Sequence, residues 1–453
     1  MTDAALAARL TEITGGPTTP GPDDGHDECL TVAGREPAHV VRPETAEQVA
    51  AVLKAASEAG TPVTARGSGT GLSGAAVPSP GGIVVSFERM NAVLEIDTDN
   101  HVAVVQPGVT LQELDARTAE HGLVYPVYPG ELSASLGGNI ATNAGGMRAV
   151  KHGVTRHHVL GLQAALPTGE LIRTGGKFAK ASTGYDLTQL IVGSEGTLAL
   201  VTEAVLKLQP RVAHQATVLA PFAGLPEVTR AVPRVVGSGL QPQVLEYIDG
   251  MTMAAITHTA DLQLGIPDAV RESAQAYLVV VLDGRTQERL DEDVEAVAQL
   301  LSELGAVDAY VLPAGSARKL IEARERAFYT AKAAGADDII DTVIPRAALP
   351  EFMTRVTAIA QAHQTFVIGC GHAGDGNVHL AVFQKDTATR STVLHELFAA
   401  AMALGGAISG EHGIGHAKRE HFLALEDPAK VELMRRLKQA FDPAGVLNPG
   451  VLL

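Results

Sequence analysis

A glycine-rich segment near the N-terminus, RGSGTGLSGAAVPSPGG, places the tightest constraint on the fold of this chain. Gly69, Gly71 and Gly74 match the G-x-G-x-x-G pattern, which a helix follows directly in a Rossmann nucleotide-binding unit. Here Pro78 and Pro80 follow instead, and proline lacks the N–H group that a helix interior requires. The sequence therefore excludes a Rossmann NAD site. It leaves either a tight loop between strands or a loop whose backbone N–H groups converge on a pyrophosphate.

A second region of small residues, PGELSASLGGNIATNAGGMRAVKHG, covers residues 129–153. Its small side chains leave room for a large flat ligand. Ser135, Asn139 and Asn143 can form hydrogen bonds with ring edges or ribityl hydroxyls. Burying a polar loop of this size is unfavourable unless a ligand satisfies its polar groups. Together, the two glycine-rich regions favour a nucleotide-type cofactor.

The rest of the chain predicts mixed helices and strands. A helix begins at Glu44 or Thr45 and ends at Gly60, a hairpin covers residues 161–175, and a strand pair covers residues 196–210. After Pro210, long helices alternate with strands, which indicates an α+β cap packed on the first part. The longer elements expected there are helices over residues 226–239, 289–305 and 317–335, and strands over 276–284, 366–372 and 378–383.

Two histidine-containing segments point to metal chemistry. His372 and His379 flank an Asp-Gly-Asn turn, which can bring both imidazoles to one metal ion, and Glu411 in SGEHGIG offers a third ligand. Three protein ligands leave an open coordination position, as catalytic sites require. Nitrogen and oxygen donors without thiolate suit Zn²⁺, Mn²⁺, Co²⁺ or Fe²⁺. The alternative is a pair of unrelated turns with exposed histidines.

Three motifs resemble the FAD-binding domain of the vanillyl-alcohol oxidase/p-cresol methylhydroxylase superfamily: RGSGTGLSG, PGELSASLGGNIATNAGG and GSEGTLALVTEAVLKL. The resemblance implies an α+β fold with a two-part FAD-binding domain, a substrate-binding cap and a C-terminal helical segment that returns to the flavin. We expect an N-terminal segment at 1–36, the FAD-binding domain at 37–210, the cap with the metal site at 211–412 and the return segment at 413–453. Because no histidine lies in residues 66–74, we expect non-covalent FAD.

The same resemblance assigns cofactor contacts. The first loop would hold the pyrophosphate, and the second region with the turn at Glu195 would line the rest of FAD. The expected FAD-contacting residues are Arg66, Gly67, Ser68, Gly69, Thr70, Gly71, Ser73, Pro129, Gly130, Ser135, Gly137, Gly138, Asn139, Thr142, Asn143, Gly145, Glu195, Gly196, Val201 and Asn448.

GHAGDGNVH and SGEHGIG resemble the paired C-terminal signatures of FAD-linked D-lactate, glycolate and D-2-hydroxyglutarate dehydrogenases. The resemblance implies that His372, His379 and Glu411 bind a divalent metal, with zinc or manganese expected, and that His412 is the general base. It also implies oxidation of a small 2-hydroxy acid, D-lactate or glycolate, to the 2-keto acid with hydride transfer to flavin N5. The electrons would leave to a quinone, a cytochrome or an electron-transfer protein.

Other residues have less distinctive surroundings. Arg324 is our candidate for a charge-assisted bond to the substrate carboxylate, the alternative being a solvated helix arginine. Phe328 lies one turn later on the same predicted helix and favours a short monocarboxylate, whereas Lys332, a further turn along, weakens that preference. We interpret Glu246 and Asp249 as structural.

The amino-acid composition limits the classes of binding partner and the cellular compartments that we expect for this protein. The formal charge of −16 disfavours nucleic acid and anionic membranes, and only two cysteines, Cys29 and Cys370, argue against a disulfide framework. The N-terminus lacks the pattern of a secretory signal, and no segment offers a transmembrane run. We therefore expect a cytoplasmic protein, with peripheral contact at the inner membrane as the alternative, and a homodimer as a candidate assembly.

Four other functions compete with a stand-alone 2-hydroxy acid dehydrogenase. They are the FAD subunit of a glycolate oxidase complex, a D-2-hydroxyglutarate dehydrogenase, an oxidase that uses O₂, and a non-catalytic flavin-binding protein. The complete set His372, His379, Glu411 and His412 argues against the last, because FAD binding alone does not need it.

Overall fold

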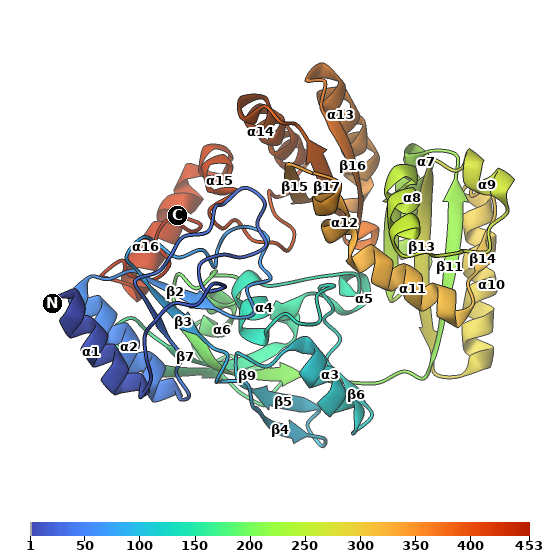
Figure 1. The fold of residues 1–453 in the computed structure, drawn as a ribbon. Coiled ribbons are helices and arrows are strands. Elements are labelled where there is room, and N and C mark those ends of the chain that lie inside the picture. Colours follow the sequence, from blue (N-terminus) through green and yellow to red (C-terminus); the bar gives the residue numbers. More distant parts are fainter. Residues whose placement is uncertain (1) are drawn as a thin grey trace.

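In the computed structural model, which describes residues 2–453, the first part of the chain builds a small parallel sheet beside a larger antiparallel one (Figure 1). The small sheet has the strand order β1-β3-β2 and consists of β1 (His39–Val41), β3 (Ile83–Ser86) and β2 (Val63–Arg66). Helices α1 (Asp3–Thr14) and α2 (Ala46–Ala59) share a buried apolar core with it. Helix α2 is capped by Thr45 and ends at Gly60 in the left-handed conformation, as predicted.

The larger sheet has the order β4-β5-β9-β7-β8. Its strands are β4 (Val93–Asp97), β5 (Val102–Val105), β9 (Leu200–Lys207), β7 (Val159–Ala165) and β8 (Leu171–Gly175). The predicted hairpin at 161–175 is confirmed by the pairing of β7 with β8. The predicted strand pair at 196–210 is wrong, because β9 pairs with β5 and β7. Leu208 alone separates β9 from β10 (Gln209–Pro210), too little for a hairpin turn, and β10 pairs with β6 (Leu123–Val124).

Loops and short helices connect these strands. Residues 67–82 run from β2 to β3 as turns and bends, in agreement with the exclusion of a helix there. The second glycine-rich region contributes the short α4. The connecting helices are α3 (Leu111–Ala119), α4 (Leu136–Thr142), α5 (Ala149–His152), the 3₁₀ turn η1 (Thr155–His157) and α6 (Leu187–Ile191).

A seven-stranded antiparallel sheet forms the centre of the second part, in the order β14-β11-β13-β12-β16-β17-β15. The strands are β14 (Tyr310–Val311), β11 (His214–Phe222), β13 (Ala276–Gly284), β12 (Val244–Asp249), β16 (Phe366–Gly371), β17 (Asn377–Phe383) and β15 (Asp338–Val343). Strand β13 explains the continuous apolar run AYLVVVLDG. Leu278 packs on one face of the sheet and Tyr277 on the other, so both faces of the strand are buried.

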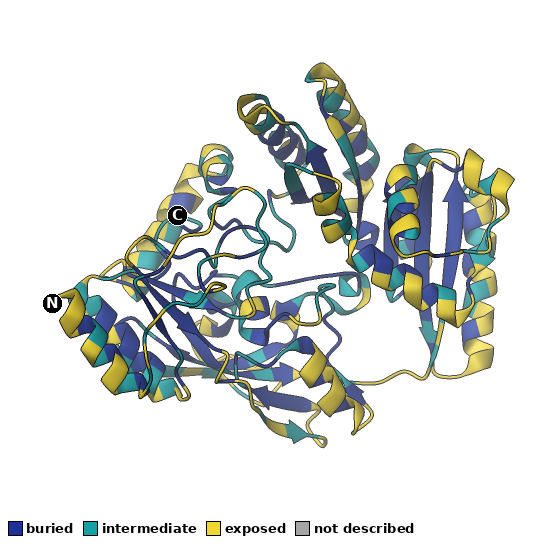
Figure 2. Cartoon of the chain, in the orientation of Figure 1, coloured by how far each residue is buried: buried dark blue, intermediate teal, exposed yellow. Residues whose placement is uncertain are grey.

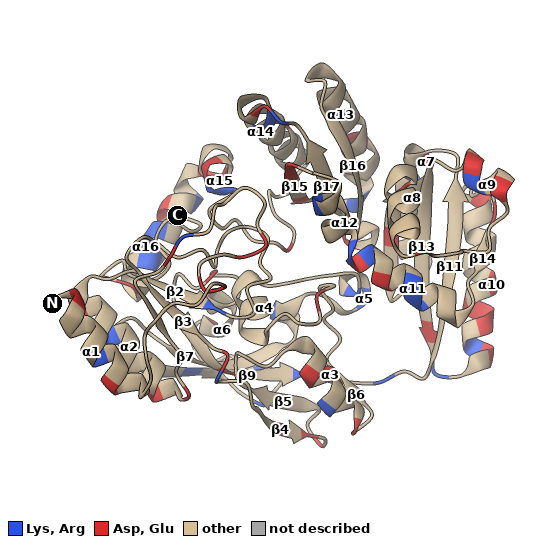
Figure 3. Ribbon diagram, in the orientation of Figure 1, with Lys and Arg blue, Asp and Glu red and all other residues tan. Residues whose placement is uncertain are grey.

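Helices cover both faces of this sheet. Figure 2 shows the buried strands in dark blue between helices that are partly exposed. The helices are α7 (Leu225–Val236), α8 (Gly250–Thr259), α9 (Asp268–Ser273), α10 (Gln287–Glu303), α11 (Ala314–Glu325), α12 (Ala327–Ala333), α13 (Leu349–Ala362) and α14 (Thr387–Ala403), with 3₁₀ turns η2 (Arg346–Ala348) and η3 (Ala373–Asp375). Helices α7, α10, α13 and α14 pack on one face, and α8 and α11 on the other. Charged residues of both signs lie on helices such as α10 and α11, whereas β11 and β13 are mostly uncharged (Figure 3). The expected α+β class is confirmed.

One predicted helix needs correction. Residues 317–335 do not form a single helix, because the chain leaves regular helical geometry at Arg326 (φ −81°, ψ 6°) between α11 and α12. Arg324 therefore lies at the end of α11 and Phe328 at the start of α12. Their relation is set by the bend between the two helices rather than by helical periodicity.

The C-terminal segment returns to the first part of the chain. Helices α15 (Arg419–Leu425) and α16 (Pro428–Phe441) precede a tail that lies beside β2. Val63 donates its N–H to the carbonyl of Val446 and accepts one from Asn448 at its own carbonyl. Leu447 is fully buried in the core of the small sheet. We propose that the chain divides after residues 36, 210 and 412. Among residues 2–453, no helix combines the length and apolar character needed to cross a bilayer.

Candidate active site

The two glycine-rich regions face each other across a cavity of about 220 Å³. Most of the predicted cofactor-contacting residues meet at its wall. These are Gly67, Ser68, Gly69, Thr70, Gly71, Ser73, Pro129, Ser135, Gly137, Gly138, Asn139, Thr142, Glu195, Gly196, Val201 and Asn448. Segments far apart in sequence therefore converge on one site, which we call the glycine cavity.

Four predicted residues lie elsewhere. Arg66 does not line the glycine cavity and donates to the carbonyl of His26 at 2.5 Å. Asn143 ends α4 in the left-handed conformation and accepts the N–H of Arg156 at 2.9 Å. Gly145 lies against Glu411, where an added Cβ would come within 2.9 Å of the carboxylate. Gly130 lines a neighbouring cavity. Arg66 and Asn143 thus form hydrogen bonds with neighbouring segments and stabilise the loops.

Glu195 and Asn448 join the segments around the glycine cavity. Glu195 is buried, and its carboxylate accepts the N–H groups of Ile414 at 2.9 Å and Gly415 at 2.7 Å. The Asn448 side chain donates to the carbonyls of Ala75 and Glu195, each at 2.9 Å. Burial raises the pKa of Glu195 against the lowering effect of these backbone bonds. Both side chains form hydrogen bonds with other groups of the protein and thereby hold the C-terminal segment in place.

The predicted metal ligands come together in the second part of the chain. Their ligand atoms lie within 4.8 Å of one another. Oε1 of Glu411 is 3.1 Å from Nε2 of His372 and 3.3 Å from Nε2 of His379. Within the described part of the chain, Nε2 of His379 and Oε2 of Glu411 are buried without a hydrogen-bond partner. Two imidazoles and a carboxylate with free donor atoms fit a divalent cation. The alternative of two unrelated exposed turns is wrong.

Glu246 supports this cluster from behind, although its sequence context suggested a structural role. It is fully buried on β12, and Oε1 accepts from Nδ1 of His372 at 2.6 Å. Its Oε2 pairs with Nη2 of Arg324 at 2.7 Å. Burial alone would lower the pKa of His372, but Glu246 and Glu411 outweigh it and raise the pKa to about 10. The bond at Nδ1 turns Nε2 of His372 toward Glu411. A charged residue inside the apolar stretch of β12 was the available sequence signal.

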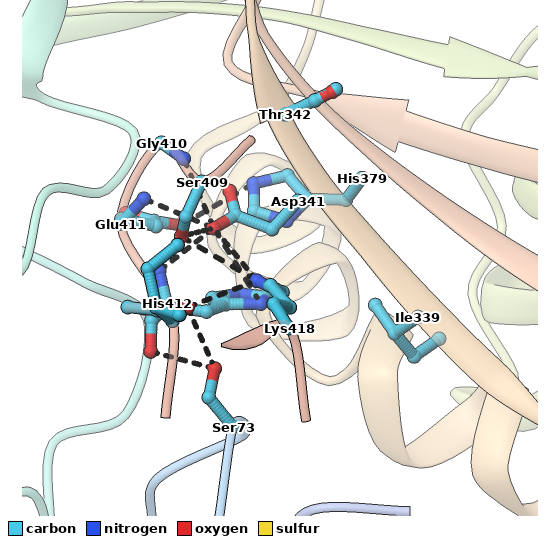
Figure 4. A network of polar contacts seen from close by, with 12 residues as sticks. Ser73, Ile339, Asp341, Thr342, His379, Ser409, Gly410, Glu411, His412 and Lys418 are labelled. Carbon is cyan, nitrogen blue, oxygen red and sulfur yellow. Dashed lines mark hydrogen bonds and ion pairs between the residues drawn. The ribbon is translucent and has the colours of Figure 1, made fainter. Parts of the chain in front are cut away.

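Asp341 was also missed by the sequence patterns. It is fully buried on β15. Its Oδ2 accepts the backbone N–H groups of Gly410, Glu411 and His412 at 3.1, 3.1 and 2.8 Å, and the Ser409 hydroxyl at 2.7 Å (Figure 4). Asp341 thereby fixes the loop that carries the predicted ligand Glu411 and the predicted base His412.

Asp341, His379 and His412 form a second group with metal-ligand geometry. Asp341 is the poorer ligand, since Oδ1 also accepts from Asn377 at 2.8 Å and its acceptor capacity is largely used. His412 is buried next to it, with Nδ1 at 3.9 Å from Oδ2 of Asp341. Burial lowers the pKa of His412 to about 4 despite the attraction of Asp341. His412 is therefore neutral at pH 7 in this environment.

His372, His379, Glu411 and His412 form what we call the histidine cluster. A second cavity of about 160 Å³ joins this cluster to the glycine cavity, and Glu411 and His412 line both cavities. Arg324 also lines this second cavity, which we call the substrate cavity. In the part of the chain that the structure describes, Nε of Arg324 is buried without a hydrogen-bond partner, whereas Nη2 lies 2.7 Å from Oε2 of Glu246. A wider groove of about 1110 Å³ lies between α8 and α13, away from these residues.

Sequence comparison agrees with this two-part arrangement. A protein-family model described as FAD linked oxidases, C-terminal domain, matches residues 211–452. A second model, described as FAD binding domain, matches residues 37–175. The chain belongs to the FAD-linked oxidase family.

This FAD-linked oxidase is 62% identical to an uncharacterized FAD-linked oxidoreductase of Mycobacterium tuberculosis, over 99% of this chain and 98% of the relative. It is 39% identical to a D-lactate dehydrogenase of Archaeoglobus fulgidus, over 91% and 90% of the two chains. The structure of p-cresol methylhydroxylase with substrate bound has the same fold, with a TM-score of 0.75 at 16% identity over 99% of this chain and 96% of the other. The fold expected from the resemblance to the vanillyl-alcohol oxidase/p-cresol methylhydroxylase superfamily is confirmed.

The glycine cavity of the FAD-linked oxidase fits a dinucleotide. Ser135 Oγ and Asn139 Nδ2 are buried without hydrogen-bond partners in the described residues, and both line the cavity. A Cβ on Gly138 would lie 3.3 Å from Ser135 Oγ and meet no other atom within 4 Å, so this position has room beside the Ser135 side chain. Small residues beside unsatisfied donors give a large flat ligand both room and polar partners.

Proposed function

We propose that this FAD-linked oxidoreductase oxidises a 2-hydroxy acid to the 2-keto acid, with D-lactate and glycolate as the first candidates. The convergence of His372, His379, Glu411 and His412 on a cavity that continues into the glycine cavity carries this proposal. The similarity to a D-lactate dehydrogenase over 91% of this chain supports it. The reaction also requires an electron acceptor to reoxidise the flavin, for which a quinone, a cytochrome or an electron-transfer protein are our candidates.

In this proposal, His372, His379 and Glu411 hold a divalent cation, and zinc or manganese matches their donor set. The residues of the glycine cavity hold FAD without a covalent bond. When bound, the cation polarises the 2-hydroxyl group and FAD accepts the two electrons of the oxidation.

The remaining tasks fall to side chains of the substrate cavity. Arg324 binds the substrate carboxylate through its unpartnered Nε group, and the ion pair between Nη2 and Glu246 holds the guanidinium in place. His412 accepts the hydroxyl proton. Because Nδ1 of His412 faces Asp341 at 3.9 Å, Nε2 is the atom left to take that proton. The fixed loop geometry set by Asp341 keeps the base beside the proposed ligand Glu411.

The visible spectrum of the purified protein tests this function. The protein is kept anaerobic and mixed in turn with D-lactate, glycolate and D-2-hydroxyglutarate, before and after removal of metal by chelation. We expect the flavin band to bleach with a 2-hydroxy acid only while metal is present. Dithionite provides the control that the flavin can be reduced in both samples. A flavin that dithionite bleaches but none of the acids does, with metal present, would contradict the proposed substrate class.

A further inference from the structure

The register of the seven-stranded sheet places an apolar row of side chains next to the histidine row. Asp341, His379 and Cys370 are paired across β15, β17 and β16. Two residues along the same strands, Ile339, Ala381 and Ile368 are paired in the same way. Because side chains two positions apart point to the same side of a sheet, this second row shares the face of His379. The three residues of the apolar row line the substrate cavity.

Helices α8 and α12 bring further apolar side chains to the substrate cavity, beside the hydroxyl groups of Thr252 and Thr330. Ile256 of α8 is 1% exposed, and Phe328 and Ala331 come from α12. Phe383 continues the sheet-side wall beyond Ala381 on β17. The histidine cluster therefore lies at one end of a cavity whose remaining walls are largely aliphatic and aromatic.

The charges of the substrate cavity match one substrate carboxylate rather than two. Among the described residues that line it, Arg324 is the one arginine or lysine, whereas Glu131, Glu325 and Glu411 bring carboxylates. Lys332, on α12 beyond Phe328, pairs at 2.7 Å with Glu28 instead. A second substrate carboxylate would lose its hydration against apolar walls without a cation to replace it.

We propose that the preferred substrate is a 2-hydroxy monocarboxylate with an apolar side chain larger than methyl, branched aliphatic or aromatic. This inference rests on the proposed function and specifies its substrate class. Arg324 takes the carboxylate, the histidine cluster faces the 2-hydroxyl, and the side chain lies on the row formed by Ile339, Ala381 and Ile368. Glycolate leaves this row uncovered, and 2-hydroxyglutarate brings a carboxylate against it.

The test compares five acids on the metal- and FAD-loaded protein: glycolate, D-lactate, D-2-hydroxy-4-methylpentanoate, D-phenyllactate and D-2-hydroxyglutarate. The second-order rate of anaerobic flavin reduction is measured by stopped flow. We expect the methylpentanoate or phenyllactate to react at least about tenfold faster than D-lactate, since each apolar methylene contributes roughly tenfold or more in a matching pocket. Hydroxyglutarate is expected to be slower than D-lactate. Calorimetric affinities of the keto-acid products should follow the same order without any turnover.

A substitution in the apolar row tests whether that row determines the substrate preference. Ala381→Leu should reduce the ratio of the methylpentanoate rate to the glycolate rate by at least about tenfold, because the larger side chain fills the apolar row. Ala388→Leu, at an exposed position of α14, is the matched control and should leave the ratio unchanged. A preference for glycolate or hydroxyglutarate, or an unchanged ratio in a folded Ala381→Leu protein, would overturn the apolar-substrate inference and leave the proposed function standing. Failure of all five acids to reduce the flavin would instead remove the proposed function itself.

Discussion

The glycine cavity and the histidine cluster meet at Glu411 and His412, yet different kinds of groups form them. The glycine cavity is formed mainly by backbone and small side chains from segments far apart in sequence, and its buried polar groups Ser135 and Asn139 remain available. The histidine cluster consists of imidazole and carboxylate side chains with buried support, in which Glu246 accepts from the His372 ring and Asp341 accepts from the backbone of His412. One site makes room for a ligand, whereas the other fixes the direction of a few atoms. In the glycine cavity, substitutions should therefore affect ligand binding by changing side-chain volume. In the histidine cluster, they should act by changing the charge and orientation of the reacting groups.

The largest expected effect is on the proposed base. His412→Ala should lower the rate of anaerobic flavin reduction by about 10²–10⁴-fold, the usual contribution of a general base. The FAD content should stay the same, because Ser73 contacts the backbone carbonyl of His412 rather than its ring. Flavin absorbance per protein and stopped-flow reduction measure the two properties separately. His121→Ala, at an exposed position, is the control. A near-normal rate in His412→Ala would remove this residue from the mechanism.

The second largest effect is expected from Glu246, which lies next to His372 of the histidine cluster. Glu246→Gln keeps the size of the side chain but removes the charge that faces His372 and Arg324. We expect metal affinity to fall by roughly 10–100-fold, as is typical when a partner of a metal-bound histidine is lost. Breaking this buried ion pair should also lower the free energy of unfolding by about 3–5 kcal/mol.

Metal titration of the chelated protein, followed by flavin reduction at each metal concentration, measures the effect of Glu246→Gln on affinity. Excess metal should restore part of the rate below the melting temperature of the variant. Glu203→Gln, which removes a charge paired with Arg173 on the larger sheet of the first part, is the control. Unchanged metal affinity in a folded Glu246→Gln protein would mean that Glu246 serves stability alone.

A volume change tests the glycine cavity. Gly138→Leu places a side chain toward the open space beside Ser135 and should weaken FAD binding by about 1–3 kcal/mol, the range for overpacking. Fluorescence titration of the FAD-depleted protein with FAD gives the dissociation constant. Gly315→Leu, at an exposed helix position with open space around it, should bind FAD normally. Equal affinities for both variants would place FAD away from Gly138.

The smallest expected effect concerns the link between the two parts of the chain. Lys332 of α12 pairs with Glu28 at 2.7 Å, with side chains 44% and 32% exposed. A double-mutant cycle of Lys332→Ala and Glu28→Ala should give a coupling free energy of only about 0.2–1 kcal/mol in chemical unfolding, because both groups remain hydrated. A coupling well above that range would show that this pair joins the two parts more strongly than its exposure suggests.

The sequence predicted those features that depend on neighbouring residues. Pro78 and Pro80 ruled out a helix after the first glycine loop, because proline acts on the turn in which it lies. Thr45 and Gly60 marked the ends of α2 through their local capping chemistry. The Asp-Gly-Asn turn brought His372 and His379 to a ring separation of 4.9 Å within one hairpin. The membership of the FAD-linked oxidase family also followed from local motifs.

Tertiary structure alone decided which residues surround those motifs. Glu246 lies 126 positions before His372, and Asp341 lies 71 positions before His412, so no local pattern connects them. The apolar row of Ile339, Ala381 and Ile368 exists only because the registers of β15, β17 and β16 align those positions. Strand register is set by the packing of the whole sheet, since a shift of one residue would turn every side chain to the other face. The chain therefore specifies the chemical groups of its site locally, and the pairing of distant strands determines their partners.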